Sequence, residues 1–555
     1  MLSVQPRQVS TSVLIIGGGG AGLRAAIAAR QSGAADVILA SKSRPGYGNN
    51  TAIAGGAFAA AAGWRNPQDT PQTHLRDTVI GGRFINQQAL MATVAAGGKR
   101  QVQDFEAFGV KFRKDDKEGL YVARAPGHSY AHHVYGENRI GTDFSLPLRA
   151  QAEKDGVRFM EGVFITRLLQ RAGRVVGAIG LDREAQPVVI SAAVTVLACG
   201  GLGQLFLHTN NAAGTTADGY ALAYHAGLTL RDMEFVQFYP TALGEWGSRT
   251  LIYEAFVFNG GAIIRNRLGE DVRARHGLQD PMVFTRDRFT RALMTEILEG
   301  RATEGKLTLD LTPVPPETMA KLAPLLPREE RECRQFPVAP TTHFAMGGLE
   351  IDPDSHTALP GLLACGEVCG GVHGANRLAG NALTEVFVFG TIAGEEAARL
   401  SAGTQPVSPE EADVLQEVDR LRQSASGRTG QCQQLRRALK QVMWDKAGII
   451  RDQAGLQGAL AEIASLNEAV SVAGAAVPRE LVKLLEMDNM LTTAEMVCRA
   501  ALKRSESRGA HFRTDYPQED NHSWLKNITI RRRESEMELD AIPVAFTEIS
   551  PEQGG

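Results

Sequence analysis

Residues 11–22, TSVLIIGGGGAG, decide the fold of this chain. The first half of this segment, 11–16, is a short β-branched apolar run typical of a buried strand. Gly17, Gly19 and Gly22 follow in G-x-G-x-x-G spacing. In that spacing the first glycine makes a tight turn, the second lets the backbone approach a pyrophosphate, and the third lets helix and strand pack closely. The segment therefore predicts a dinucleotide-binding unit at the start of the chain.

The flanking sequence supports a βαβ unit that is later interrupted. An Ala-rich helical stretch leads to a second strand at 36–40, which ends in Ser41 and Lys42. The acidic residue that usually binds an adenosine ribose is missing at this place. Two further strands, 194–199 and 362–365, return much later in the chain. This order indicates a nucleotide-binding domain that contains an insertion.

Composition excludes several classes of function. The 555 residues include 43% hydrophobic and 22% charged residues with a net charge of −3, which gives no electrostatic case for nucleic acid or an anionic membrane. The first residues have no apolar signal-peptide core, and the longest apolar run, 52–64, is too short to span a bilayer. We expect a cytoplasmic protein without direct membrane insertion, although it could dock at a membrane through a partner.

The cysteines predict neither disulfides nor a metal site. A disulfide framework is typical of small secreted chains, and this chain is large. Cys365 and Cys369 lie close together, but no second pair follows them. Because a zinc or iron–sulfur site needs about four ligands, we expect no metal in this chain.

The pattern becomes helical between about 410 and 515. Helical periodicity is clear at 412–423, 434–444 and 493–503, and Ser408-Pro409 marks the boundary. The last 30 residues are charged and irregular in pattern, and predict a tail on the surface or on a partner.

Four ordered motifs then identify a family resemblance. They resemble motifs of the flavoprotein subunit of succinate dehydrogenase and fumarate reductase, a family that includes L-aspartate oxidase. The segments are 232–241 (DMEFVQFYPT), 338–348 (VAPTTHFAMGG), 366–381 (GEVCGGVHGANRLAGN) and 506–517 (ESRGAHFRTDYP).

This resemblance implies an α/β fold of three parts. A Rossmann-like FAD-binding domain (1–237 and 344–405) is interrupted by an α+β capping domain (238–343). A C-terminal helical domain (406–520) and a tail (521–555) follow. The resemblance also explains Ser41 and Lys42, because these relatives carry Ser-Lys there and Glu367 is their expected ribose contact.

The resemblance implies FAD as the cofactor. Residues 48–51, GNNT, lack the histidine to which some relatives attach FAD covalently, so we expect noncovalent binding. The residues expected to contact FAD are Gly17, Gly19, Gly20, Ala21, Gly22, Ser41, Lys42, Asn50, Thr51, Gly55, Gly56, Gly200, Gly201, Asp218, His343, Glu367, Arg377, Asn381, Ala382 and Leu383.

The same motifs imply a site for a small carboxylic acid. Arg377 matches the family arginine that binds a substrate carboxylate, a task for which its forked guanidinium is suited. His343 matches a histidine that donates to the substrate. Tyr253, Glu254 and Tyr239 complete the expected catalytic set.

Three departures alter the expected substrate. Val257 stands where the family has its proton-shuttle arginine, Tyr239 replaces a carboxylate-binding histidine, and Tyr253 replaces a threonine. With Phe256 and Phe258 nearby, the pocket is expected to be more apolar. A dicarboxylate would leave one charge poorly paired there. The resemblance therefore favours a C–C bond oxidoreductase whose acid is not plain succinate or fumarate.

Alternatives stay open at this point. Succinate, fumarate or aspartate chemistry would require a relocated proton shuttle, for which Arg265 is the nearest spare arginine. An electron-carrying subunit without carbon chemistry is the third reading. An iron–sulfur or ferredoxin-like partner subunit is expected. Beyond Arg265, the candidates for proton transfer are Tyr253, Tyr239, His128, His132 and His133.

Overall fold

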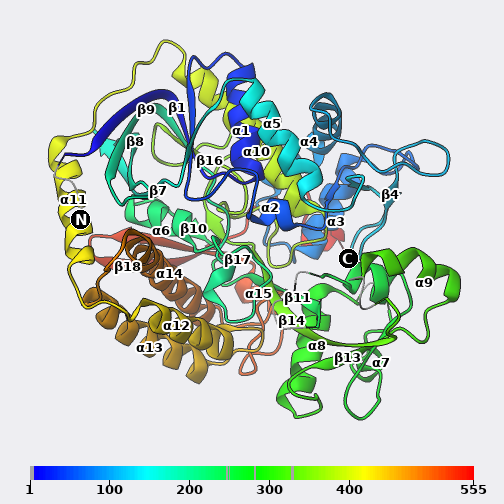
Figure 1. The fold of residues 1–555 in the computed structure, drawn as a ribbon. Coiled ribbons are helices and arrows are strands. Elements are labelled where there is room, and N and C mark those ends of the chain that lie inside the picture. Colours follow the sequence, from blue (N-terminus) through cyan, green and yellow to red (C-terminus); the bar gives the residue numbers. More distant parts are fainter. Residues whose placement is uncertain (1–4, 245–247, 249, 281–282, 327–330, 555) are drawn as a thin grey trace.

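A seven-stranded sheet forms the centre of the computed structural model, which describes residues 5–554 except 245–247, 249, 281–282 and 327–330. The order is β6-β2-β1-β9-β8-β7, with β16 also beside β9 (Figure 1). The strands β6, β2, β1, β9 and β16 run parallel, whereas β7 and β8 are antiparallel. Their bounds are β1 Arg7–Ile16, β2 Val37–Ser41, β6 Arg158–Glu161, β7 Phe164–Arg171, β8 Arg174–Leu181, β9 Pro187–Leu197 and β16 Leu362–Ala364.

The predicted strand–glycine–helix unit is present and tightly packed. Helix α1 (Gly20–Gln31) follows β1, and a Cβ at Gly22 would lie 1.9 Å from the carbonyl oxygen of Gly17. A Cβ at Gly17 would in turn lie 2.1 Å from the carbonyl oxygen of Ala198 in the neighbouring segment. These approaches leave no room for a side chain, so the glycines place α1 directly against the sheet.

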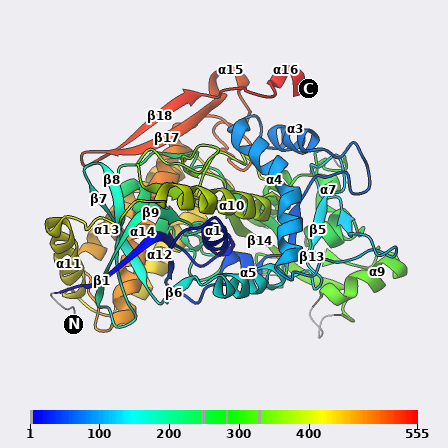
Figure 2. The same cartoon turned by 90° about the horizontal axis from the view of Figure 1, so that it is seen from above.

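A second helix packs along α1 and closes the same domain. Helix α10 (Asn381–Ser401) lies beside α1 in Figure 2, and a Cβ at Gly394 would be 2.3 Å from the carbonyl oxygen of Ala25. The distant segment after β16 thus returns to the domain that β1 begins, as the sequence predicts. The remaining elements of this domain are α2 (Asn50–Ile53), β3 (Ala57–Ala59), α3 (Pro71–Gly81), α4 (Gln88–Ala107), β4 (Val122–Ala123), β5 (His133–Tyr135), α5 (Thr142–Lys154), η1 (Gly203–Leu205), α6 (Asp218–His225), β10 (Leu230–Arg231) and β15 (Gly348–Leu349).

The insertion forms a separate lobe, the cap. Its four-stranded antiparallel sheet has the order β11-β14-β13-β12 and appears as the green lobe in Figure 1. Its elements are β11 (Val236–Leu243), a π-helical turn η2 (Tyr253–Phe258), β12 (Ile263–Arg265), α7 (Val272–Arg275), α8 (Arg286–Leu298), β13 (Leu307–Asp310), α9 (Pro316–Leu322) and β14 (Gln335–Ala345).

The region after 410 is helical, as expected. Helices α12, α13 and α14 pack together and bury an apolar core that includes Leu439, Met487 and Val497. The bounds are α11 Glu411–Ala425, α12 Cys432–Ala447, α13 Gln453–Ser471 and α14 Pro478–Lys503.

The expectation of an irregular C-terminal tail is wrong. Strands β17 (Lys526–Arg533) and β18 (Glu536–Pro543) form an antiparallel hairpin, and β17 also pairs with β10 (Leu230–Arg231). The physical reason is alternation within the charged sequence, because Ile528 and Ile530 are buried whereas Thr529 and Arg531 are not, and the buried Asn527 donates to Asp232.

A buried ion network joins the C-terminal region to the segment that leads into the cap. Arg504, at the end of α14, pairs with Glu234 at 2.7 Å and with Glu506 at 3.0 Å, and Arg508 pairs with Glu506 at 2.8 Å. All four side chains are fully buried. Glu234 lies just before the first strand of the cap.

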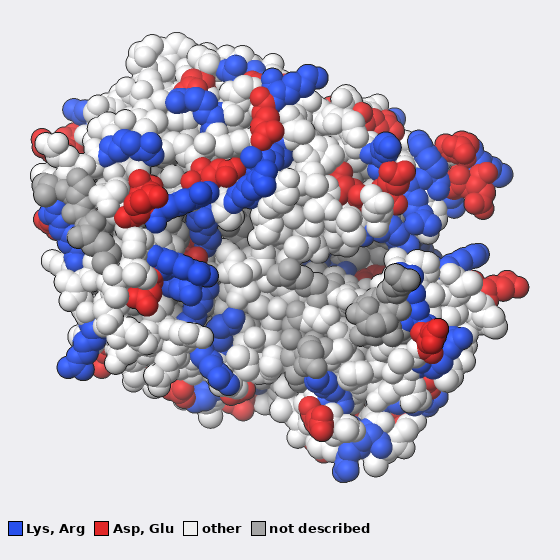
Figure 3. Space-filling model, in the orientation of Figure 1, with Lys and Arg blue, Asp and Glu red and all other residues white. Residues whose placement is uncertain are grey.

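Three observations concern the helices, the thiols and the surface charges. Of the helices that the structure describes, none is both long enough and apolar enough to cross a bilayer. All six cysteines lie within the described residues and are free thiols. Basic and acidic side chains alternate over the face shown in Figure 3.

We predict that Gly22→Ala lowers the free energy of unfolding by about 1–3 kcal/mol and reduces flavin content, because the added methyl group pushes α1 from the sheet. Urea unfolding and the flavin-to-protein ratio measure both effects. Gly458→Ala is the control, since its Cβ would meet only the flexible Lys446 side chain, whose Nζ is 3.1 Å away. Equal behaviour of the two variants would contradict the argument.

Candidate active site

One large cavity of about 960 Å³ lies between the sheet domain and the cap. Its lining begins at the glycine turn after β1, continues over the loops after β9 and β16, and ends on cap residues 250–259 and 322–325. On the molecular surface a hollow separates the cap from the larger body (Figure 3). This position, at the carboxyl ends of parallel strands, is where α/β sheets bind ligands.

The glycine turn leaves one end of the cavity ready for phosphate groups. Gly17 to Ala21 line it, and α1 begins there after Gly19, which has no side chain to cap the helix; the Gly20 amide donates to Thr51 Oγ1 at 3.1 Å. An ideal Cβ at Gly19 or Gly200 would meet no atom within 4 Å, so the backbone is open to a ligand at both places. A glycine-rich helix N-terminus, whose dipole favours negative charge, is suited to a pyrophosphate.

Most of the predicted cofactor residues line this cavity. Four do not line it: Gly22, Gly56, Gly201 and Asn381. Gly22 packs against Gly17, Gly56 has a φ of +64°, and a Cβ at Gly201 would meet Glu367. Asn381 forms hydrogen bonds with other buried side chains. Those that line it are Gly17, Gly19, Gly20, Ala21, Ser41, Lys42, Asn50, Thr51, Gly55, Gly200, Asp218, His343, Glu367, Arg377, Ala382 and Leu383.

Glu367 offers a buried carboxylate in the cavity. It accepts hydrogen bonds from the Ala345 amide at 3.1 Å and from Asn50 Nδ2 at 3.3 Å. Burial raises its pKa to about 7, because these neutral donors only partly offset the loss of water. A ribose hydroxyl would satisfy the free lone pairs of this group. The turn, the open backbone and this acceptor therefore fit FAD.

Lys42 lies at the cavity but is already paired. Its ammonium contacts Asp218 at 2.6 Å and Glu486 of α14 at 2.7 Å. The two carboxylates outweigh the effect of burial and raise the pKa of Lys42. Lys42 therefore ties the helical domain to the cavity rim and contributes little net charge to the cavity.

At the other end, one glutamine side chain holds two arginines. Gln237 Oε1 accepts from Arg377 Nη2 at 3.0 Å and from Arg286 Nη1 at 3.2 Å. Gln237 Nε2 in turn donates to the Arg377 carbonyl at 2.8 Å. Both arginines line the cavity. The first strand of the cap thus fixes the guanidinium of α8 beside the guanidinium of the FAD domain.

The two arginines differ in their charge partners. Arg286 forms an ion pair with Glu254 at 2.6 Å, and Glu254 raises the pKa of Arg286 against the opposing effect of burial. Among the described residues, Arg377 contacts no carboxylate, and its guanidinium donates only to the neutral Gln237. Burial, with Arg286 nearby, lowers the pKa of Arg377 to about 9. An external carboxylate would relieve this uncompensated charge.

Tyr239 positions Glu254 from behind the cavity wall. Its hydroxyl donates to Glu254 Oε2 at 2.5 Å and accepts from the Tyr253 amide at 3.0 Å. The tyrosine does not itself line the cavity, and burial raises the pKa of its hydroxyl well above 10. Tyr239 is therefore a positioning residue for Glu254.

His343 is a neutral group in the cavity. Burial, Arg377 and Arg286 lower its pKa well below 6.5. Its Nδ1 lies 3.2 Å from Asn210 Oδ1, and its ring centre is 5.3 Å from that of Tyr239. His343 and Arg377 both line the cavity, and the sequence motifs led us to expect them together.

The expected aromatic wall is not at the cavity. Tyr253 donates its hydroxyl to the Phe284 carbonyl, and Phe256 and Val257 are buried in the core of the cap. Phe258 stacks on Phe284. The apolar lining on the cap side comes instead from Leu251, Ala255, Leu322, Pro324 and Leu325. An apolar cap side is therefore present, but it is built from other residues than those predicted.

The candidates for proton transfer differ in whether they line the cavity. Arg265 of β12 pairs with Asp310 and does not line the cavity, which removes it as a neighbour of a bound substrate. Of the three histidines considered, His133 lines the cavity, whereas His128 and His132 lie behind it.

Sequence reasoning missed Arg286. It stands at the first position of α8, where the helix dipole disfavours a cation. An arginine in that unfavourable place, followed by a regular amphipathic helix, was an available signal for a functional role. Only the fold shows that Arg286 reaches the cavity, which Val257 does not line.

Comparisons with known proteins agree with this geometry. Residues 12–383 match the FAD binding domain family, and residues 436–554 match the fumarate reductase flavoprotein C-terminal family. An uncharacterized FAD-dependent oxidoreductase of Methanocaldococcus jannaschii is 37% identical over 94% of this chain and 96% of its own. One subunit of the fumarate reductase (CoM/CoB) of Methanothermobacter marburgensis is 35% identical over 94% of this chain and 97% of its own.

A solved structure shows the same fold. The FrdA chain of a quinol fumarate reductase from E. coli superimposes with a TM-score of 0.90 at 28% identity, covering 99% of this chain and 100% of that one. The chain therefore belongs to the FAD-dependent family of fumarate reductase and succinate dehydrogenase flavoprotein subunits and L-aspartate oxidase.

Proposed function

We propose that this FAD-dependent oxidoreductase acts on a carbon–carbon bond next to a single carboxylate. The observation that carries the proposal is the difference between the two cavity arginines. Arg377 has no carboxylate partner among the described residues, while Glu254 neutralises Arg286. A second substrate carboxylate would meet the Glu254 carboxylate and the leucine-rich cap lining. A monocarboxylic acid with an apolar end fits this distribution of charge.

The residues at the cavity support a defined division of roles. Arg377 binds and orients the substrate carboxylate, with His343 beside it. FAD, which the glycine turn after β1 and Glu367 would hold, would supply hydride transfer at the carbon β to that carboxylate. Arg286 delivers or removes the proton at the α carbon, because it is the cavity arginine that is paired with a carboxylate. Glu254, whose side chain is 26% exposed, returns that proton to solvent or takes it up.

Fumarate or succinate is the second candidate substrate. Relatives covering nearly the whole chain carry the name fumarate reductase. Arg286 also offers a proton-transfer group for this chemistry, so the absence of arginine at 257 does not argue against it. Thr250 and Asn259 are polar cap residues that could receive a second carboxylate.

An electron carrier without carbon chemistry is the weakest reading. Such a subunit has no need of an uncompensated Arg377 beside a neutral His343 in one cavity. Maintaining an unpaired buried guanidinium costs stability. That cost is accounted for if a carboxylate binds there.

Electron exchange is proposed to involve an iron–sulfur subunit. The cysteines are free thiols, and burial raises the pKa of Cys199, Cys365, Cys369 and Cys498, so their thiolates are disfavoured as cluster ligands. Related chains are subunits of fumarate reductases and succinate dehydrogenases. Free thiols also fit a reducing compartment, and we propose the cytoplasm, with membrane docking only through such a partner.

Crotonate and fumarate provide a matched test of the substrate. They differ only in a methyl group in place of one carboxylate. We expect anaerobic reoxidation of the reduced flavin to have a kcat/KM about tenfold or more higher with crotonate, since its methyl group suits the apolar lining. Reoxidation by fumarate alone would overturn the single-carboxylate proposal in favour of the second candidate. No response to any acid would favour the electron carrier.

Arg286→Gln tests the proton-transfer role. We expect kcat to fall about 10²-fold or more with the flavin content unchanged, because the ion pair with Glu254 is lost. Arg265→Gln is the matched cap control and should keep its activity. The reverse pattern, with Arg265→Gln inactive and Arg286→Gln active, would restore the relocated-shuttle alternative.

The pH dependence of binding tests Arg377. Its folded-state pKa of about 9 means that the guanidinium is charged below that pH and loses its charge as pH rises through it. We expect kcat/KM for a carboxylate substrate to decline above about pH 9. Crotonamide is the control, since its binding needs no cation. An equal alkaline decline for acid and amide would contradict the assignment.

A further inference from the structure

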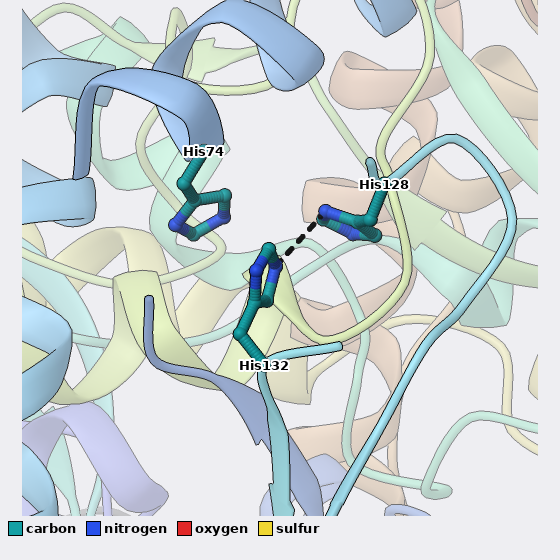
Figure 4. Close-up of side chains that lie close together, drawn as sticks. All are labelled: His74, His128 and His132. Carbon is teal, nitrogen blue, oxygen red and sulfur yellow. Dashed lines mark hydrogen bonds between the residues drawn. The ribbon is translucent and has the colours of Figure 1, made fainter. Parts of the chain in front are cut away.

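Four buried histidines lie behind the loop that carries Arg377. His74 comes from α3, His128 and His132 come from the segment before β5, and His133 begins β5. Their exposed fractions are 0%, 1%, 1% and 3%. One ring nitrogen each of His74, His128 and His132 lies within 4.8 Å of the other two. Figure 4 shows the rings of His74 and His128 on either side of His132.

The outer nitrogen of each ring faces a hydrogen-bond acceptor. His132 Nδ1 lies 2.8 Å from Asp69 Oδ1, and His128 Nε2 lies 3.0 Å from the Ala379 carbonyl. His74 Nε2 lies 2.7 Å from the Asn381 side-chain oxygen. Since carbonyl and carboxylate oxygens only accept, these three nitrogens carry the protons. In neutral rings the opposite nitrogens are therefore lone-pair donors.

The remaining nitrogens have no satisfactory partners of their own. His128 Nδ1 and His132 Nε2 face each other at 3.0 Å, and His74 Nδ1 has no hydrogen-bond partner among the described residues. Two neutral lone pairs at that distance repel, so a cation must lie between them. It is either a proton or a metal ion.

A carboxylate next to the cluster requires the same positive charge. The Asp69 side chain is 1% exposed, its one ionic contact among the described residues is His132, and its second oxygen is without a hydrogen bond there. A carboxylate that holds the far nitrogen of a metal-bound histidine is the usual support of such ligands. It fixes the ring and increases its basicity.

From these contacts we propose that His74, His128 and His132 bind one first-row divalent transition metal of the Zn²⁺ type. Imidazole nitrogens suit such ions, and Zn²⁺–N bonds of about 2.0–2.1 Å place tetrahedral ligand nitrogens about 3.3 Å apart. The His128–His132 separation is already close to that value. A small shift of His74 would complete the set, leaving a fourth position for water. The sequence predicted no metal because its cysteines include only one close pair, which is too few ligands to bind one. The proposed site uses histidines instead.

The site would stabilise the loop beside the cavity. His128 and His133 both contact the Ala379 carbonyl, and His74 contacts Asn381. Ala379 lies two residues after Arg377. The ion would therefore hold the substrate-binding loop from behind, without touching the substrate.

Metal analysis of the untagged, flavin-loaded protein tests this inference independently of its activity. After purification and Zn²⁺ reconstitution followed by gel filtration, we expect about one first-row metal ion per chain. X-ray absorption at the metal edge should show about three nitrogen ligands near 2.0 Å. His128→Gln and His74→Gln should each lower the metal content about tenfold or more with flavin retained.

His356→Gln is the matched control. His356 belongs to a more exposed group with Asp352 and Asp354, which is the alternative place for an ion. If the ion is held by the buried histidines, the loss of His356 should leave the metal content unchanged. If the histidine variants do not fold, the absorption spectrum of the wild-type protein decides the question. Less than about one tenth of an ion per chain after reconstitution, or a metal lost with His356 instead, would overturn the proposal.

Discussion

The buried ion pair between Arg504 and Glu234 is the interaction on which the arrangement of the domains depends. Arg504 ends the last long helix, and Glu234 precedes the strand that enters the cap. Glu506 and Arg508 extend the network into the C-terminal segment, where Arg508 also donates to the Arg83 carbonyl of the FAD domain. Removing one partner of a fully buried pair typically costs about 3–5 kcal/mol. The network therefore holds the C-terminal region against the FAD domain at the point where the chain enters the cap.

The same segment also positions the two arginines of the cavity. Three residues after Glu234, Gln237 holds Arg286 of the cap and Arg377 of the FAD domain with one carbonyl oxygen. Two like charges side by side are tolerable because Glu254 pairs with one of them. The other is left for an external carboxylate. The site thus has one arginine paired with a carboxylate and one without such a partner. This arrangement follows from the position of β11, which carries Gln237.

The residues that we expected to depart from the family motifs lie behind the cavity wall. Tyr239 and Tyr253 do not reach the cavity, and each hydroxyl is committed to a hydrogen bond inside the cap. Val257 lies in the same apolar core. Apolar and aromatic packing therefore surrounds η2, while Glu254 and Arg286 keep an ionisable pair at the cavity surface. The cationic group on the cap side of the cavity comes from α8, not from the motif around residue 257.

The sequence by itself determined the nucleotide-binding unit, the order of the domains and the presence of His343 and Arg377 at one cavity. The first depends on the spacing of glycines that admit no side chain, and the other two on ordered motifs that resemble those of the family. The tertiary structure decided the rest. Arg286 meets Glu254 because a helix and a turn 32 residues apart face one cavity. Distant segments likewise meet in the histidine cluster, in the apolar wall at Leu322 and in the C-terminal hairpin. The local sequence does not indicate which distant side chain will compensate a buried charge.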